Sequence, residues 1–241
     1  ISLAVDRLAA MMLTVTAVVA VACHLAASDS LSRASPRFHG LLQLQLAGLN
    51  GAFLTADLFN LFVFFELLLA ASYAMLLVAT DRASVRAGVH YVAVNLFGSA
   101  LFLMGAALLY GVLGTLNLAD LSVRAASVAV GDRWLVEAAG LMLLVAFGIK
   151  AAAFPLGLWL PRTYAAAAAP VAALFAIMTK VGLYAMVRVG TLVFGATSFA
   201  AAWQPLLIGF GIATLAFSAF AGLAARDLRS LASWTIAGSA G

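Results

Sequence analysis

Residues 144–155, LVAFGIKAAAFP, place a lysine and a proline inside a long apolar run. A membrane-spanning helix needs about 20 mostly apolar residues, and a charge near its centre costs at least about 2.5–3.5 kcal/mol. Pro155 lacks an N–H group and clashes with the carbonyl of Ala151, so we expect the helix to break between Lys150 and Pro155. Broken spans are tolerated where protein or water surrounds them. The stretch therefore predicts a discontinuous, hydrated membrane helix that is turned away from lipid.

The composition of all 241 residues indicates that a bilayer surrounds the chain. Hydrophobic residues make up 66% and charged residues 9%, against about 45–50% and about 25% in soluble domains. These values exclude a soluble enzyme, a disordered region and a nucleic-acid-binding module. The single cysteine, Cys23, lies in an apolar run and excludes a disulfide framework or a cysteine metal site.

Apolar runs between short polar stretches predict an all-α fold, a polytopic transmembrane helix bundle. Residues 114–133 have mixed character and predict a short amphipathic or interfacial piece. The chain starts without Met and stops within an apolar run, so we expect residues 1–241 to be a fragment of one transmembrane domain. About seven full spans and the start of an eighth after Arg229 are expected. The full spans are residues 8–27, 41–56, 58–79, 87–113, 134–154, 165–187 and 199–225.

The arginines lie mostly between the apolar runs and predict the orientation of the bundle. More of them fall on one side of the predicted spans than on the other, and that side is expected to be cytoplasmic. The arginines of the richer side are Arg33, Arg37, Arg82, Arg86, Arg162, Arg226 and Arg229.

Both lysines, in contrast, lie inside predicted spans. Lys150 belongs to the stretch quoted above, and Lys180 lies in residues 174–183, LFAIMTKVGL. Arginine stays protonated, whereas a buried lysine can lose and regain a proton. The lysines are therefore predicted proton carriers. The alternative is that their side chains extend toward the membrane surface.

Glu66 is the predicted partner of a lysine. It lies among phenylalanines and leucines in residues 59–69, FNLFVFFELLL, where an unpaired carboxylate is unfavourable. A lysine from another span would stabilise it, and a neutral glutamic acid bonded to a carbonyl is the alternative. Glu137 follows Arg133 and Trp134 near the membrane surface and is expected to be an ordinary surface charge.

Two other residues are possible proton relays. His90 opens the fourth predicted span, and its unperturbed pKa lies near neutrality. A histidine at the interface or satisfied in the core is an equal alternative. Asp57 lies between two spans, where capping of the helix that starts at Leu58 is favoured over proton entry. No catalytic residue and no metal site are expected.

Several motifs resemble those of the antiporter-like membrane subunits, most closely the D-type subunits of the multi-subunit Mrp-type or Pha-type Na+/H+ antiporters. One departure is residues 162–169, RTYAAAAA, where the family usually has an acid- and proline-rich loop, so no proton entry is assigned there. The motifs are residues 57–66 (DLFNLFVFFE), 95–99 (NLFGS), 109–111 (LYG), 114–117 (GTLN), 148–156 (GIKAAAFPL), 159–161 (WLP) and 170–182 (PVAALFAIMTKVG).

The resemblance implies a longer parent with two inverted helix repeats, the first over residues 39–190 and the start of the second over residues 199–241. It implies that Glu66, Lys150 and Lys180 translocate protons by ion-pair-controlled switching of the lysine pKa. The implied protein is a secondary transporter component rather than an enzyme, without a cofactor. It would work with other membrane subunits, protons and Na+ in a bacterial cell membrane.

Two alternatives stay open. The first is a homologous proton-pumping component of respiratory complex I or of a membrane-bound hydrogenase. The second is a structural assembly protein without an ion path.

Overall fold

The computed structural model describes residues 2–27, 37–77 and 82–241. These residues form helices and two isolated antiparallel bridges. The expected loop around Arg33 and the loop at Asp81 lie outside the described residues. The helices are α1 (Arg7–Ala27), α3 (Phe38–Leu54), α4 (Leu58–Leu76), α5 (Arg82–Leu113), α6 (Leu118–Ala126), the short 3-10 helix η1 (Val130–Asp132), α7 (Arg133–Ala151), α8 (Leu160–Ala166), α9 (Ala169–Leu192), α10 (Ala200–Leu223) and α11 (Leu228–Gly238).

Within the described ranges, six helices are long and apolar enough to cross a membrane: α1, α4, α5, α7, α9 and α10. Helix α3 has 17 residues, at the lower end of the range of about 17–25 that a span needs. The predicted all-α transmembrane bundle is confirmed.

The helix boundaries follow the apolar runs to within a few residues. The mixed stretch forms α6 and η1, and α11 begins at Leu228, close to the expected start of the last segment. Helix α9 starts at Ala169 rather than at residue 165, because Ala165 and Ala166 end α8. Pro170 is in the first turn of α9, where its missing N–H leaves no intrahelical bond unmade.

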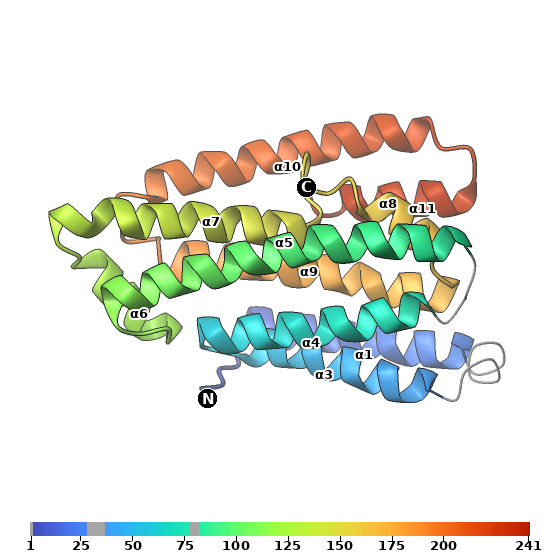
Figure 1. Cartoon of the computed structure of the whole chain (residues 1–241), viewed down its shortest axis with the longest axis horizontal. Helices are drawn as coiled ribbons and strands as arrows, with labels where there is room; N and C mark the ends of the chain where they lie inside the picture. The colour runs from blue at the N-terminus through green and yellow to red at the C-terminus, as the bar shows by residue number, and fades with distance from the viewer. Residues whose placement is uncertain (1, 28–36, 78–81) are drawn as a thin grey trace.

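The long helices lie side by side along the longest axis of the molecule (Figure 1). Helices α7 and α9 form the centre of the bundle. In their most apolar 18-residue stretches 61% of the residues are buried, against 11% in α10 and 22% in α1. Gly182 lets α9 approach α7 closely, because a Cβ there would lie 2.5 Å from the backbone nitrogen of Ala151. Small residues at helix contacts are typical of membrane bundles, where close backbone approach stabilises packing.

A short extended connection fixes the start of α4. The N–H of Leu58 donates to the carbonyl of Leu116 at 2.8 Å, and the carbonyl of Ala56 accepts from Leu118 at 2.9 Å. On the other side, the N–H of Ala56 donates to the carbonyl of Ser2 at 3.0 Å. This connection holds the start of the helix that carries Glu66.

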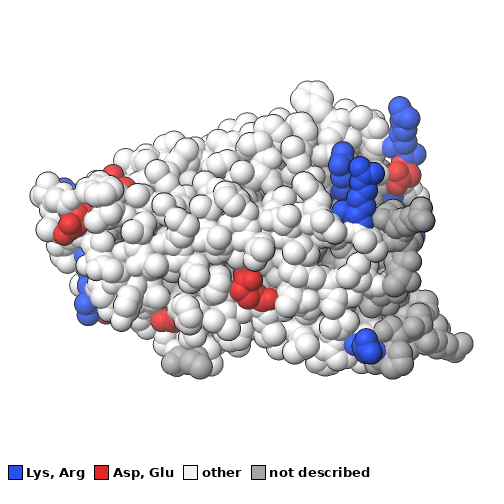
Figure 2. All heavy atoms as spheres, viewed as in Figure 1, with Lys and Arg blue, Asp and Glu red and all other residues white. Residues whose placement is uncertain are grey.

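Charged side chains gather at the two ends of the bundle on the face shown in Figure 2, and acidic atoms are also visible about midway between them. The flanks between the ends are mostly uncharged. This distribution fits a molecule whose flanks face lipid and whose ends reach the polar headgroups.

Candidate functional site

The ammonium group of Lys150 is buried in the last turn of α7. The side chain of Lys150 is 2% exposed, and Nζ lies 3.8 Å from Oε1 of Glu66 on α4. The ammonium also lies 5.0 Å from the ring centroid of Phe65. A buried charge without a partner is strongly destabilising, so the carboxylate and the ring stabilise the protonated amine. The predicted pair of Glu66 and Lys150 is present, and its part in proton transfer stays a prediction.

Ser99 on α5 connects the two charged groups. Its hydroxyl donates a hydrogen bond to Oε1 of Glu66 and accepts one from Nζ of Lys150 at 3.0 Å. Because the hydroxyl donates its proton to the carboxylate, a lone pair of the serine oxygen is free to accept a hydrogen bond from the ammonium. Three helices therefore meet through one chain of polar contacts.

Sequence reasoning missed the role of Ser99, although a signal was present. Asn95 and Ser99 lie one helical turn apart, so both polar side chains share one face of an apolar helix. Both residues are buried. A pair of polar residues on one face of an apolar span indicates an interior, polar contact.

A small cavity adjoins Lys150. Its volume is about 10 Å³, at the lower limit of the roughly 10–15 Å³ that a cavity needs to hold one water. Oδ1 of Asn95 has no hydrogen-bond partner in the part of the chain that the structure describes, whereas Nδ2 donates to the carbonyl of Tyr91 at 3.0 Å. A bound water would satisfy the amide oxygen. The cavity is lined by Phe65, Leu68, Leu69, Asn95, Lys150, Trp159 and Met178.

The helix break lies directly after Lys150, within the predicted interval. Ala152 has a left-handed backbone with φ 57°, and its N–H donates to the carbonyl of Ile149 at 3.2 Å. Trp159 adds its indole N–H to the same carbonyl at 2.9 Å. The turn that ends α7 thus comes before Pro155, and its carbonyls are capped by protein groups. Hydration of the break stays a prediction.

Gly157→Ala is expected to destabilise this break. A Cβ at position 157 would lie 1.9 Å from the carbonyl oxygen of Ala152, and overpacking of this kind costs typically about 1–3 kcal/mol. Ala152→Gly is the matched control, since a left-handed alanine is unfavourable by roughly 1–2 kcal/mol. The thermal unfolding midpoint of the purified full-length protein measures both. We expect a lower midpoint for Gly157→Ala and an equal or higher one for Ala152→Gly. An unchanged midpoint for Gly157→Ala would contradict the described packing.

Lys180 lies in the middle of α9, but its hydrogen-bond partners differ from those of Lys150. Its Nζ donates to Oγ of Ser239 at 2.5 Å and lies 3.4 Å from Oγ1 of Thr179. Ser239 follows the end of α11, whereas Lys150 bonds toward α4 and α5. The two lysines therefore have separate polar partners. A proton moving from one to the other would need water or further side chains between them.

The other candidates lie toward the ends of the bundle. Asp57 caps α4, because its carboxylate accepts from the N–H of Asn60 at 2.9 Å, so the predicted capping is confirmed. His90 is exposed on α5 and lines a pocket at the end of the bundle. Glu137 accepts a hydrogen bond from Oγ of Ser198 at 3.0 Å. Relay roles for His90 and Asp57 stay predictions.

The described residues contain no group of three or more His, Cys, Asp or Glu side chains that could hold a metal ion.

An apolar helix bundle in which a buried lysine pairs with a carboxylate of a neighbouring span defines a multi-pass membrane protein with an ion-pair site between its helices. Residues 55–239 match the family described as NADH:quinone oxidoreductase/Mrp antiporter, TM. The chain belongs to this family, and it is a multi-pass bacterial membrane protein.

Two relatives confirm the resemblance to the D-type antiporter subunits. The D subunit of a probable K(+)/H(+) antiporter from Rhizobium meliloti (strain 1021) is 48% identical over 243 residues, covering 100% of this chain and 45% of that protein. The D subunit of the Na(+)/H(+) antiporter from Bacillus subtilis (strain 168) is 40% identical over 240 residues, covering 98% of this chain and 48% of that protein. The chain thus spans about half the length of these relatives.

Two solved structures share the fold. The Mrp complex from Dietzia sp. DQ12-45-1b aligns with a TM-score of 0.87 and 32% identity, over 98% of this chain and 44% of that chain. Respiratory complex I from Thermus thermophilus with bound NADH aligns with a TM-score of 0.81 and 27% identity, over 98% of this chain and 49% of that chain.

Proposed function

We propose that this chain is part of a proton-translocating subunit of a multi-subunit monovalent cation/H+ antiporter. The observation that carries the proposal is the buried Lys150 ammonium, joined to Glu66 through Ser99. An ion pair with a buried ammonium is weak evidence for stability alone, since apolar residues of similar size often stabilise a fold as well. Paired ionisable groups inside membrane-spanning helices instead favour a transport role.

In the proposed mechanism, Lys150 holds a proton while the carboxylate of Glu66 stays near it. When the pair loosens, the apolar surroundings favour the neutral amine, so Nζ releases its proton. Ser99 holds the two side chains next to each other, because its hydroxyl donates to the carboxylate and accepts from the ammonium. A water in the cavity beside Asn95 is the first group that could receive the proton, and Lys180 is the proposed later carrier.

The repeat organisation belongs to the same proposal. We assign residues 39–190 to a first antiporter-like repeat and residues 199–241 to the start of a second. The chain spans about half the length of its relatives, which supports one repeat with part of another. Other membrane subunits are the proposed partners, because the relatives are named as antiporter subunits.

Cation-dependent proton flux tests the proposed function. Inverted vesicles that contain the full-length chain with its co-encoded subunits would be loaded with a pH-sensitive dye, and Na+, K+ or Li+ would then be added. We expect flux with Na+ or K+, since the relatives carry these two ions in their names. Flux that depends on NADH or quinone instead of a cation gradient would contradict the antiporter.

A redox-driven complex is the second candidate, and the shared fold with complex I favours it. In that case the same ion pair would move protons, but electron transfer in other subunits would drive it. Purification of the native complex distinguishes the two. Co-purified iron–sulfur subunits would support the redox complex, and their absence from an active complex would support the antiporter.

Ser99→Ala is expected to lower proton flux without abolishing it. The change removes two hydrogen bonds to charged groups but keeps the direct contact of Nζ with Oε1 of Glu66 at 3.8 Å. We therefore expect a loss on the order of ten-fold, which corresponds to about 1.4 kcal/mol and is less than the two bonds would contribute in full. Ser99→Thr keeps the hydroxyl and is the control, with flux within about three-fold of wild type if its added methyl group is accommodated. Equal flux in the alanine variant and wild type would show that the serine bridge is not needed.

A further inference from the structure

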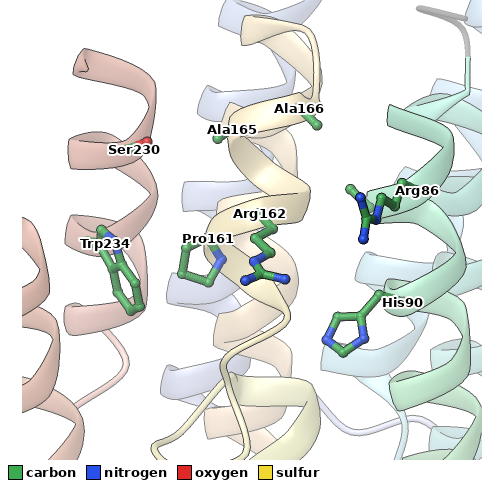
Figure 3. Close-up of a pocket in the computed structure, with 9 residues that line it drawn as sticks. Arg86, His90, Pro161, Arg162, Ala165, Ala166, Ser230 and Trp234 are labelled. Atoms are coloured by element: carbon green, nitrogen blue, oxygen red, sulfur yellow. The ribbon is translucent and has the colours of Figure 1, made fainter. Parts of the chain in front are cut away.

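A pocket at one end of the bundle lies between α5, α8 and α11 (Figure 3). Its volume is about 670 Å³, which is within the range of pockets that hold small molecules. Arg86 and His90 come from α5, Arg162 from α8, and Ser230 and Trp234 from α11. The pocket is distinct from the Lys150 site, because Lys150 lines a separate and much smaller cavity.

The polar wall of this pocket is basic. Figure 3 shows Arg86, His90 and Arg162 facing the same space from two helices. Among the residues described, no acidic residue lines the pocket and neither arginine has an ion-pair partner. Two guanidinium groups that face one space repel each other, and an anion between them would remove that repulsion. Guanidinium groups also match phosphate oxygens geometrically.

The remaining wall is apolar and lies at one end of the bundle. Pro161 and three alanines contribute carbon surface, and the half-buried Trp234 lies at the side formed by α11. Arg86 lies in the second turn of α5, near the end of the bundle. Tryptophan and arginine at this depth are typical of the boundary between headgroups and acyl chains. A fitting ligand therefore has an anionic group and an apolar body.

We propose that this pocket binds an anionic phospholipid, with Arg86 and Arg162 holding the phosphate. The His90 imidazole faces the same space and is placed to donate to a further phosphate oxygen. The Ser230 hydroxyl donates to Oδ2 of Asp227 at 2.8 Å, so its oxygen lines the pocket without a free proton. The acyl chains lie along the apolar wall. Basic pockets between transmembrane helices recognise anionic headgroups in this way. Free phosphate shares the anionic chemistry but would leave the apolar wall uncovered.

Lipid binding to the intact complex tests the proposal. The complex with the full-length chain is stripped of lipid in detergent, and native mass spectrometry then follows addition of phosphatidylglycerol, phosphatidylcholine or inorganic phosphate. The test variant is Arg86→Gln/Arg162→Gln. The matched control, Arg37→Gln/Arg226→Gln, removes two exposed arginines outside the pocket. Arg86→Lys/Arg162→Lys keeps the charge.

Phosphatidylglycerol is expected to bind wild type and the control equally. Each basic side chain near an anionic headgroup contributes enough for about a five-fold change in affinity, so the glutamine pair is expected to bind on the order of 30-fold more weakly. The lysine pair should restore most of the affinity. Equal weakening in the control pair would overturn the proposal, as would equal binding of phosphatidylcholine. Competition by inorganic phosphate as strong as that by the lipid would indicate a free-anion site instead.

Discussion

Lys150→Arg is expected to remove most proton flux, nearly as much as Lys150→Ala. Arginine keeps the positive charge, so it can still pair with Glu66, but its pKa stays above about 12 and it does not release a proton. Loss of a group that donates and accepts protons lowers rates by typically about 100-fold or more. The interior cavity beside Lys150 is only about 10 Å³, so a guanidinium would also crowd Phe65 and Ser99.

The measurement is cation-driven proton flux in vesicles at equal amounts of inserted protein. Leu141→Met is the control on the same helix, because Leu141 is exposed on α7 and far along the helix from its last turn. We expect wild-type flux from this control. Flux near wild type in Lys150→Arg would show that a permanent charge is sufficient and that proton release from Lys150 is unnecessary.

Glu66→Gln is expected to leave the protein inserted and folded but to lower flux by at least about ten-fold. Glutamine keeps the shape of the side chain and can still accept from Ser99, so the change isolates the negative charge. Without it the buried ammonium loses its charged partner, whose own side chain is half-buried, and an unpaired charge in an apolar interior is unfavourable. Lys150 would then be neutral for most of the time and would carry few protons.

Glu137→Gln is the matched control for this change. Glu137 has the same chemistry and a serine partner, but it lies near the start of α7, away from Lys150. Its flux is expected to equal wild type. Normal flux in Glu66→Gln would remove the ion pair from the mechanism, and an equal loss in both variants would point to a general effect of lost carboxylates.

The positions of the helices and the Glu66–Lys150 pair could be predicted from the sequence, because both follow from the apolar surroundings that a bilayer provides. Long apolar runs have to form helices in a bilayer, and a lysine and a glutamate inside apolar spans strongly favour each other. The direction of Lys180 could not be predicted in the same way. Which face of α9 meets α7 depends on the close approach at Gly182, a tertiary contact. As a result, Lys180 bonds to Ser239 beside α11.

The helix break was predictable in place but not in form. Pro155 shows that the helix cannot continue, whereas the turn that ends it is made by Ala152 in a left-handed conformation. Alanine gives no sequence signal for that conformation, because glycine is the residue that usually adopts it. Trp159 completes the cap through a contact between residues ten positions apart.

The coupling of Glu66 to Lys150 is tested most directly by a double-mutant cycle in flux. Wild type, Glu66→Gln, Lys150→Ala and the double variant would be compared at equal insertion over about three orders of magnitude of flux. Groups that act as a unit are strongly non-additive, so the double variant is expected to match Lys150→Ala within about two-fold. A double variant whose loss equals the product of the two single losses, a further drop of about ten-fold, would mean that the residues act independently.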